Sequence, residues 1–254
     1  MQEHRSNSRE RAAGTRVLAL LSGEAGVGKT SLAVRLGCEL SRRGHRTLLV
    51  DAEPGPAAAP VSPSARPQRS LRESVAGAAP LQDSTATGPG GLRLARGGSR
   101  VVEQLKAAFD VILLDTAPGV GRDVTDYVAM ADEIVLVTTN NFAAAADASG
   151  VVTALNRDGL DKPVHAVVNR ARSAEEAARV FAKLRGSAER FLGFDLNWLG
   201  WLPEDSSVDG AASRRTSLSE AFPGSTAARC LARLVSDLER KLEAPWPAGL
   251  AAED

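Results

Sequence analysis

One glycine-rich stretch, LSGEAGVGKTS at residues 21–31, constrains this chain more than any other feature. It has the spacing G-x-x-x-x-G-K-[ST], in which Gly23 is the first glycine and Gly28, Lys29 and Thr30 are the last three positions. An apolar run typical of a buried strand precedes it, and a helical pattern follows. Glycines lack a Cβ, so the backbone can curl around an anion with its N–H groups pointing inward. The stretch therefore predicts a phosphate-binding loop that ends at the N-terminus of a helix.

The side chains of this loop predict how a nucleoside triphosphate would be held. Lys29 is expected to reach the β- and γ-phosphates, and the Thr30 hydroxyl is expected to ligate Mg²⁺. The helix N-terminus adds a positive partial charge. The alternative is a glycine-rich turn that binds nothing, and the flanking strand and helix argue against it. The residues expected at the nucleotide are Gly23, Glu24, Ala25, Gly26, Val27, Gly28, Lys29, Thr30 and Ser31.

Length, charge and cysteine content narrow the class of protein. The 254 residues suffice for one large domain, and the 31 basic and 31 acidic residues cancel. No overall field therefore favours nucleic acid or an anionic membrane, and we expect no specific nucleic-acid partner. Cys38 and Cys230 are far apart and lack metal-ligand spacing. With no signal-peptide pattern in the sequence, these features favour a reduced, cytoplasmic protein.

Apolar runs alternate with helical patterns along the chain. Strands are expected at residues 16–22, 46–51, 91–95, 110–115, 133–139, 164–169 and 196–202. Helices are expected at residues 29–43, 70–76, 101–108, 124–131, 142–156, 174–191 and 226–242. Strands that are apolar throughout and separated by helices predict an α/β fold, a doubly wound, mostly parallel sheet with helices on both faces. Ligands bind such a sheet at the edge where the strands end.

A second motif supports the phosphate-binding loop. The stretch FDVILLDTAPG, at residues 109–119, is an apolar strand that ends in Asp115. This pattern is typical of a Walker B element, whose carboxylate meets the Mg²⁺ shell from a neighbouring strand. The N–H of Gly119, four residues later, is a candidate sensor of the γ-phosphate. Alone, such a strand is common, but beside the loop it favours binding of a nucleoside triphosphate.

At this point the chain resembles a known family. The segments SGEAGVGKT, LLVDAE, DVILLDTAPG, ADEIVLVTT, VVNR and LGWLPED occur in the order and spacing of the MinD/ParA ATPases, P-loop NTPases with a deviant Walker A motif. Longer segments around residues 70–99, 169–205 and 221–234 resemble the FlhG/FleN branch of flagellar-number regulators. The resemblance implies a P-loop ATPase domain over residues 16–242, which contains a proline-rich loop at 54–69. We expect a disordered tail at 1–15 and a C-terminal tail at 243–254.

The resemblance also implies roles for individual residues. ATP or ADP and Mg²⁺ are the expected cofactors. The Asn of VVNR contacts adenine in such proteins, which indicates Asn169 with Arg170 beside it, although Asn169 read alone is equally consistent with a strand-end cap. The loop after the last strand lines the base. The residues so assigned are Pro203, Glu204 and Asp205 at the base, Lys29, Asp51, Glu53 and Asp115 in catalysis, and Thr30, Asp51 and Asp115 at the metal.

The departures from the family are concentrated at the dimer contact. Family loops read KGGVGKT, and their first lysine reaches the partner's phosphates, whereas this chain has Glu24 followed by Ala25. A carboxylate about 4 Å from a phosphate costs on the order of 4 kcal/mol at a surface-like dielectric. Glu53 replaces the second Asp of the Asp-x-Asp pattern, and GPAAAP replaces the segment that carries a partner-contacting Asn. We therefore expect an ATP-dependent homodimer that is weak.

Two terminal features of the branch are missing. Residues 1–11 show no segment resembling DQA-x-x-LR, which engages a partner GTPase in such proteins. Residues 243–254, EAPWPAGLAAED, are acidic and interrupted by proline, whereas the branch ends in a basic amphipathic helix that lies on the membrane. We therefore expect weak membrane binding or none.

Three functions remain open from the sequence. The first is a slow ATPase switch that regulates the number or placement of flagella, or of a similar polar machine, through an unknown protein partner. The second is a regulatory module that binds nucleotide, hydrolyses little and acts through partners, which the change at Glu24 favours. The third is a ParA-like partitioning ATPase, for which the neutral net charge gives no support.

Overall fold

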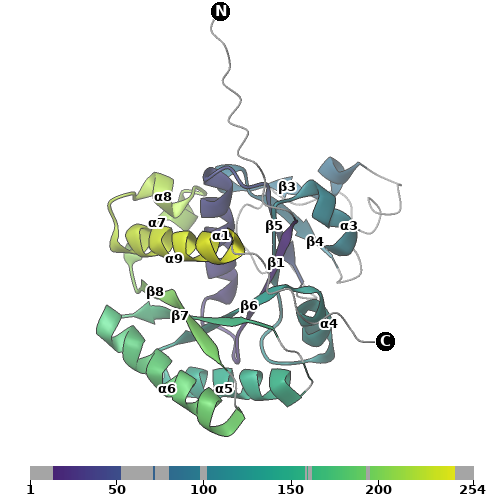
Figure 1. Cartoon of the computed structure of the whole chain (residues 1–254). Coiled ribbons are helices and arrows are strands. Elements are labelled where there is room, and N and C mark those ends of the chain that lie inside the picture. The colour runs from purple at the N-terminus through teal and green to yellow at the C-terminus, as the bar shows by residue number, and fades with distance from the viewer. Residues whose placement is uncertain are drawn as a thin grey trace, which may run out of the picture.

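The computed structural model describes residues 14–52, 71, 80–97, 102–157, 159, 162–192 and 195–243. Its strands are β1 (Arg16–Leu21), β2 (Thr47–Asp51), β3 (Ala86–Thr87), β4 (Arg93–Arg96), β5 (Val111–Asp115), β6 (Glu133–Thr139), β7 (Val164–Ala171) and β8 (Leu196–Pro203). They form one sheet in the order β3-β4-β2-β5-β1-β6-β7-β8 (Figure 1). Among the described residues, every pairing is parallel except that of β3 with β4.

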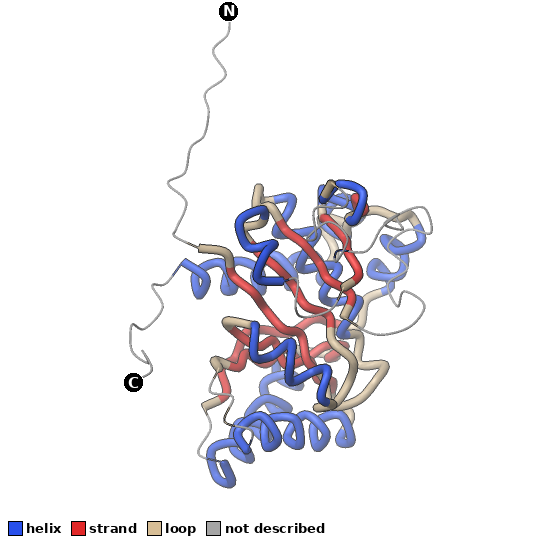
Figure 2. The backbone as a smooth tube through the Cα atoms, turned by 90° about the vertical axis from the view of Figure 1, so that its right-hand side faces the viewer, coloured by secondary structure: helices blue, strands red, loops and turns tan. Residues whose placement is uncertain are grey.

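Helices cover both faces of this sheet. They are α1 (Lys29–Arg42), α3 (Val102–Leu105), α4 (Arg122–Met130), α5 (Phe142–Arg157), α6 (Ala174–Leu192), α7 (Ser206–Ser213), α8 (Leu218–Ala221) and α9 (Thr226–Glu243). Short 3₁₀ turns occur at η1 (Leu81–Ser84), η2 (Pro89–Gly91) and η4 (Lys106–Ala108). In Figure 2 the strands form a single twisted layer with helices on either side. The expected doubly wound, mostly parallel fold is confirmed.

The hydrophobic core lies in two layers, one on each face of the sheet. Alternate β1 residues serve the two layers: Val17 and Ala19 pack toward α3, α4, α5 and α6, whereas Leu18 and Leu20 pack toward α1, α7, α8 and α9. These four side chains are fully buried. A strand covered on both faces has no solvent side, so its sequence is an unbroken apolar run. This is why the central strands are visible in the sequence.

Most elements begin and end within two residues of their expected positions, and β6 matches its expected range. The sequence pattern predicts no helix between residues 202 and 226, and there the structure differs, because α7 and α8 lie in that segment. The α7 helix is short, rich in small residues and contains Gly210, so it lacks an apolar period. The α8 helix spans four residues, too few for a periodic pattern, but its capping box, Ser217 with Glu220, is a sequence signal.

Several expectations lie outside the described residues. They are the disordered tail except for its last two residues, the proline-rich loop at 54–69, the C-terminal tail beyond residue 243, and the helix at 70–76 apart from Leu71. Leu71 is helical and fully buried in the layer that contains α3 and α4. Within the part of the chain that the structure describes, no helix combines the length and apolar character needed to cross a bilayer.

A buried carboxylate joins α1 to the C-terminal helices. Glu39 is 1% exposed. Its oxygens accept hydrogen bonds from Arg42, the last residue of α1, from Arg43, the C-cap of that helix, and from the Ser219 hydroxyl of α8, at 2.7–3.0 Å. Arg43 also pairs with Glu239 of α9 at 2.7 Å. Burial raises the pKa of Glu39, but the hydrogen bonds from Arg42, Ser219 and Arg43 outweigh it and hold that pKa below its ordinary value.

This geometry predicts a pH-dependent contribution to stability. Glu39→Gln should lower the free energy of unfolding by about 2 kcal/mol near neutral pH, because it removes the charge from four hydrogen bonds. A carboxylate with a depressed folded pKa stabilises the fold above its unfolded pKa, and that contribution is lost as pH falls through the folded pKa. Urea unfolding should therefore show a clear difference between wild type and variant near neutral pH and a smaller one at about pH 3.

The control for this prediction is Glu189→Gln. Glu189 pairs with Arg185 on the surface of α6, and both side chains are about half exposed. Loss of this exposed ion pair should lower the free energy of unfolding by less than about 0.5 kcal/mol. Equal losses for the two variants near neutral pH would show that the Glu39 cluster does not hold α1 to α8.

Candidate functional site

The glycine-rich loop lies at the carboxyl end of β1, between β5 and β6, and leads into α1. Gly26 and Gly28 have φ of +83° and +88°, in the left-handed region that residues with a Cβ rarely adopt. A Cβ on Gly28 would lie 2.4 Å from Asn169 Nδ2, and a Cβ on Gly23 would lie 2.3 Å from the carbonyl carbon of Asp147 in α5. The loop therefore requires glycine at Gly23 and Gly28 because neighbouring segments approach it closely.

Two residues at the end of β7 hold the loop by its backbone. The Asn169 amide donates a hydrogen bond from Nδ2 to the carbonyl of Val27 at 2.8 Å, and Arg170 donates from Nη1 to the carbonyl of Gly26 at 3.0 Å. Asn169 is 3% exposed. Arg170 has a φ of +55°, which costs a residue with a side chain about 1 kcal/mol or more. Fixing these carbonyls on the β7 side favours the phosphate-binding arrangement, in which loop N–H groups face the ligand.

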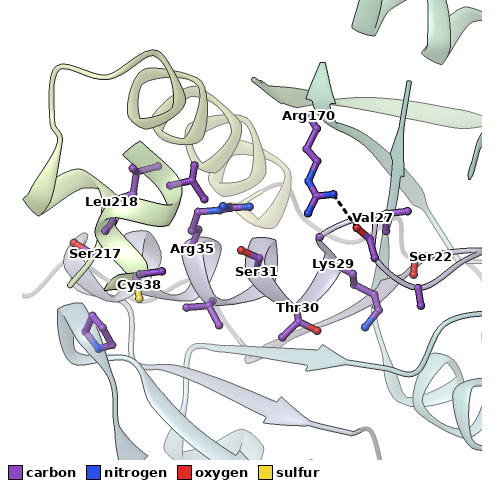
Figure 3. A pocket seen from close by; sticks show the side chains of 18 of the residues that line it. Ser22, Val27, Lys29, Thr30, Ser31, Arg35, Cys38, Arg170, Ser217 and Leu218 are labelled. Atoms are coloured by element: carbon purple, nitrogen blue, oxygen red, sulfur yellow. Dashed lines mark hydrogen bonds between the residues drawn. The ribbon is translucent and has the colours of Figure 1, made fainter. Parts of the chain in front are cut away.

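A buried ion pair lies beneath the loop. Lys29 Nζ is 2.5 Å from Asp115 Oδ1, and the two side chains are 7% and 4% exposed. Lys29 also donates to the backbone carbonyl of Thr116. Figure 3 shows Lys29 directed away from Arg35 and Ser31, on the opposite side of α1. The structure thus brings together the lysine and the strand-end carboxylate that the two motifs predict at one nucleotide site.

The expected metal ligands come from neighbouring elements. Asp51 and Asp115 are paired residues at the carboxyl ends of β2 and β5, and Thr30 is in the first turn of α1. Asp51 is half-buried, with Arg96 Nε 3.7 Å from its Oδ2. No cluster of three His, Cys, Asp or Glu occurs among the residues that the structure describes. Mg²⁺ in phosphate sites is held by one or two carboxylates together with phosphate oxygens, so this donor set fits Mg²⁺ with a nucleotide. Glu53 lies outside the described residues.

Three cavities adjoin the loop, and two of them are also lined by residues of α1. The first has a volume of about 360 Å³ and runs from Glu24 and Lys29 along α1 to Cys38 and Leu218 (Figure 3). The second has a volume of about 270 Å³ and contains the residues expected at the base: Asn169, Arg170, Pro203, Glu204 and Asp205. Asn169 thus both holds the loop and lines this cavity. Its contact with adenine stays a prediction.

Asp205 shapes the wall of the second cavity. Its carboxylate accepts hydrogen bonds from the backbone N–H groups of Ser207, at 2.9 Å, and of Ala227, at 3.1 Å. It is therefore the N-cap of α7 and also satisfies an N–H at the start of α9. The hydrogen bonds with Ser207 hold the pKa of Asp205 below its usual range. Its two partners are structural, so Asp205 positions the wall.

Two further residues bear on the site. Glu24, half-buried, lines a cavity that also contains Arg170, Arg172 and Glu204. The N–H of Gly119 donates to the carbonyl of Ser22 at 2.8 Å, which joins the loop after β5 to the start of the glycine-rich stretch. Its role as a γ-phosphate sensor stays a prediction.

Sequence reasoning did not identify Arg35 of α1, which lines the first and second cavities. Arg35 falls four residues after Ser31, which is one helical turn. That spacing is the signal by which the sequence indicates a second polar residue on the same face as the loop.

Comparisons with known proteins agree with this geometry. Residues 18–218 match a family model described as the CobQ/CobB/MinD/ParA nucleotide binding domain. The antiactivator FleN of Pseudomonas aeruginosa is 32% identical over 228 residues, which are 83% of this chain and 81% of FleN. The flagellum site-determining protein YlxH of Helicobacter pylori is 23% identical, over 90% of this chain and 83% of YlxH.

Solved structures show the same fold. The septum site-determining protein MinD of Pyrococcus horikoshii, complexed with Mg-ADP, superposes with a TM-score of 0.70 at 21% identity. The match covers 91% of this chain and 99% of that protein.

The buried pair of Lys29 and Asp115 predicts that substitutions can change nucleotide affinity and folding stability independently. Lys29→Ala should weaken binding of Mg-ADP by about 10- to 100-fold, because a charge-assisted phosphate contact is lost. It should also lower the free energy of unfolding by about 3 kcal/mol or more, since Asp115 is left buried and unpaired. Adding Asp115→Asn should restore much of that stability and none of the binding. Calorimetric titration and urea unfolding measure the two effects, and equal affinities for wild type and Lys29→Ala would remove the phosphate-loop assignment.

Proposed function

We propose that this chain, which belongs to the CobQ/CobB/MinD/ParA family of nucleotide-binding domains, is an ATP-dependent switch protein with slow hydrolysis. The observation that carries the proposal is the assembled loop. Gly26 and Gly28 have positive φ. Asn169 and Arg170 donate hydrogen bonds to the carbonyls of Val27 and Gly26, and Lys29 contacts Asp115 at the end of β5. A loop of this kind, followed by a helix N-terminus, is suited to a triphosphate.

The residues at the loop have distinct proposed tasks. Loop N–H groups and Lys29 bind phosphate, and Thr30, Asp51 and Asp115 hold Mg²⁺, which when bound neutralises charge on the phosphates. Asn169 and the segment from Pro203 to Asp205 contact the base. Phosphoryl transfer depends on positioning and electrostatics rather than covalent chemistry, so the rigidity of the loop is itself a contribution.

The proposed cellular role is regulation of the number or placement of flagella. It rests on relatives whose names are the antiactivator FleN and the flagellum site-determining protein YlxH. We propose that residues 16–242 form the single domain that carries this role. We also propose a cytoplasmic location, in keeping with two free, buried cysteines, Cys38 and Cys230, and little binding to membranes.

A second candidate is a nucleotide-binding regulator that hydrolyses almost nothing. Glu24 is the observation that favours it, because a half-buried carboxylate lines the cavity at the loop where a positive charge would assist transfer. Release of inorganic phosphate from ATP by the purified protein discriminates the two candidates. Turnover that is abolished by Lys29→Ala supports the switch, and the absence of turnover despite tight ATP binding supports the regulator.

We expect Glu24 to weaken ATP-dependent dimerisation. Glu24→Lys combined with Ala25→Gly should strengthen the ATP-bound dimer, because it restores a cation able to reach the partner's phosphates. Size-exclusion chromatography with light scattering, in an Asp51→Ala background that blocks hydrolysis, gives the dimer fraction. Glu189→Lys, a similar charge reversal on the surface of α6, is the control and should change nothing. A tight ATP-dependent dimer of the chain with Glu24 intact, at micromolar concentration, would show that Glu24 is no handicap.

The cellular role predicts complementation. Expressed in a Pseudomonas aeruginosa strain that lacks FleN, this chain should shift the number of flagella per cell toward the wild-type value, and Lys29→Ala should not. Electron microscopy counts the flagella, and immunoblots confirm equal protein levels. No shift at normal protein levels would contradict a role equivalent to that of FleN.

A further inference from the structure

Arg35 lies where the first and second cavities beside the loop meet. Both cavities are lined by Arg35, Gly28, Ser31 and Arg170. Within α1, Ser31 and Arg35 therefore border both the phosphate side and the proposed base side of the site. Figure 3 shows its side chain beside Ser31, with the Arg170 guanidinium across the cavity.

The guanidinium of Arg35 is costly where it lies. Its Nε is buried and has no hydrogen-bond partner among the residues that the structure describes. Burial and the positive charge of Arg170 lower the pKa of Arg35, Asp209 opposes them, and the pKa that results is about 10. A buried donor without a partner destabilises a fold, so such groups in natural proteins have a reason to be there.

Helix geometry directs Arg35 toward the loop. It follows Ser31 by four residues, and residues with this spacing share a helix face. Long side chains on a helix point back toward its N-terminus, which here is the phosphate end of α1. Arg170 approaches the same place, because its Nη2 is 3.9 Å from the position of a Cβ on Gly28. Two guanidinium groups from different elements therefore flank the segment from Gly28 to Ser31.

We propose that Arg35 is a phosphate ligand, which binds the phosphate nearest the nucleoside and donates to it from Nε. This inference rests on the nucleotide binding proposed above. Together with Arg170 it supplies, from the same chain, positive charge that Glu24 does not supply. A charged acceptor pairs the buried donor, so the cost of Arg35 in the free protein is offset when the nucleotide binds.

The test compares nucleotides that differ in their phosphates. Calorimetric titration with adenosine, AMP, ADP and ATP is made for wild type, Arg35→Gln and Arg35→Lys. Arg35→Gln should weaken the binding of AMP, ADP and ATP by a similar factor, about tenfold or more, and leave the affinity for adenosine unchanged. Arg35→Lys should recover part of the loss, because it keeps the charge without the planar donor set. Arg179→Gln, an exposed arginine on α6, is the control and should match wild type.

Stability provides an independent readout. In the absence of nucleotide, Arg35→Gln should unfold at the same temperature as wild type or a higher one, since it removes a half-buried positive charge whose Nε is buried without a partner among the described residues. With saturating AMP the wild type should gain more stability than the variant. A residue that only supports the fold would show the reverse, with lower stability in the free protein.

The outcomes separate this inference from the function on which it rests. If wild type binds none of the nucleotides, the proposed function fails and the inference fails with it. If wild type binds and Arg35→Gln binds AMP equally well, the inference alone is wrong. An equal loss of affinity for adenosine and for AMP in Arg35→Gln would also overturn the inference. Such a result would place Arg35 at the base, where a guanidinium plane stacks on the ring.

Discussion

The contact between Lys29 and Asp115 joins the two motifs on which the site depends. It links the first turn of α1 to the end of β5, and both groups are almost fully buried. A buried pair is stable only while each member keeps a partner, so the arrangement fixes the distance between helix and strand. In the proposed function, a nucleotide with Mg²⁺ would offer each group an alternative partner, phosphate for Lys29 and metal for Asp115. The same two side chains therefore can support the fold and respond to the ligand.

Positive charge is distributed unusually around this loop. The resemblance to MinD/ParA loops implies a lysine where this chain has Glu24. Two arginines from other elements, Arg35 on α1 and Arg170 on β7, line the cavities beside the loop. A cation supplied by the same chain does not require a partner subunit, whereas a cation supplied across an interface makes binding and dimerisation one event. The arrangement is consistent with nucleotide binding that is less dependent on assembly.

The sequence predicts the parts of the structure that rest on local patterns. The loop, β5 and β6 follow from glycine spacing and from apolar runs buried on both faces. Other features depend on contacts distant in sequence and could not be derived. Asn169 donates a hydrogen bond to a carbonyl 142 positions away in the sequence, and Ser219 donates one to Glu39, 180 positions away. No periodicity encodes such pairs. The short helix α7 was missed because Gly210 and its small neighbours form no apolar stripe.

The grip on the loop acts through main-chain oxygens, and this has an evolutionary consequence. Asn169 and Arg170 donate hydrogen bonds to the backbone carbonyls of Val27 and Gly26. Every amino acid has a backbone carbonyl, so these contacts do not depend on which side chains the loop carries. Substitution at Glu24 or Ala25 can therefore proceed without loosening the anchorage. A loop lysine that contacts a partner subunit can therefore be replaced by glutamate while the loop keeps its conformation. Dimerisation can then change in evolution before ligand binding does.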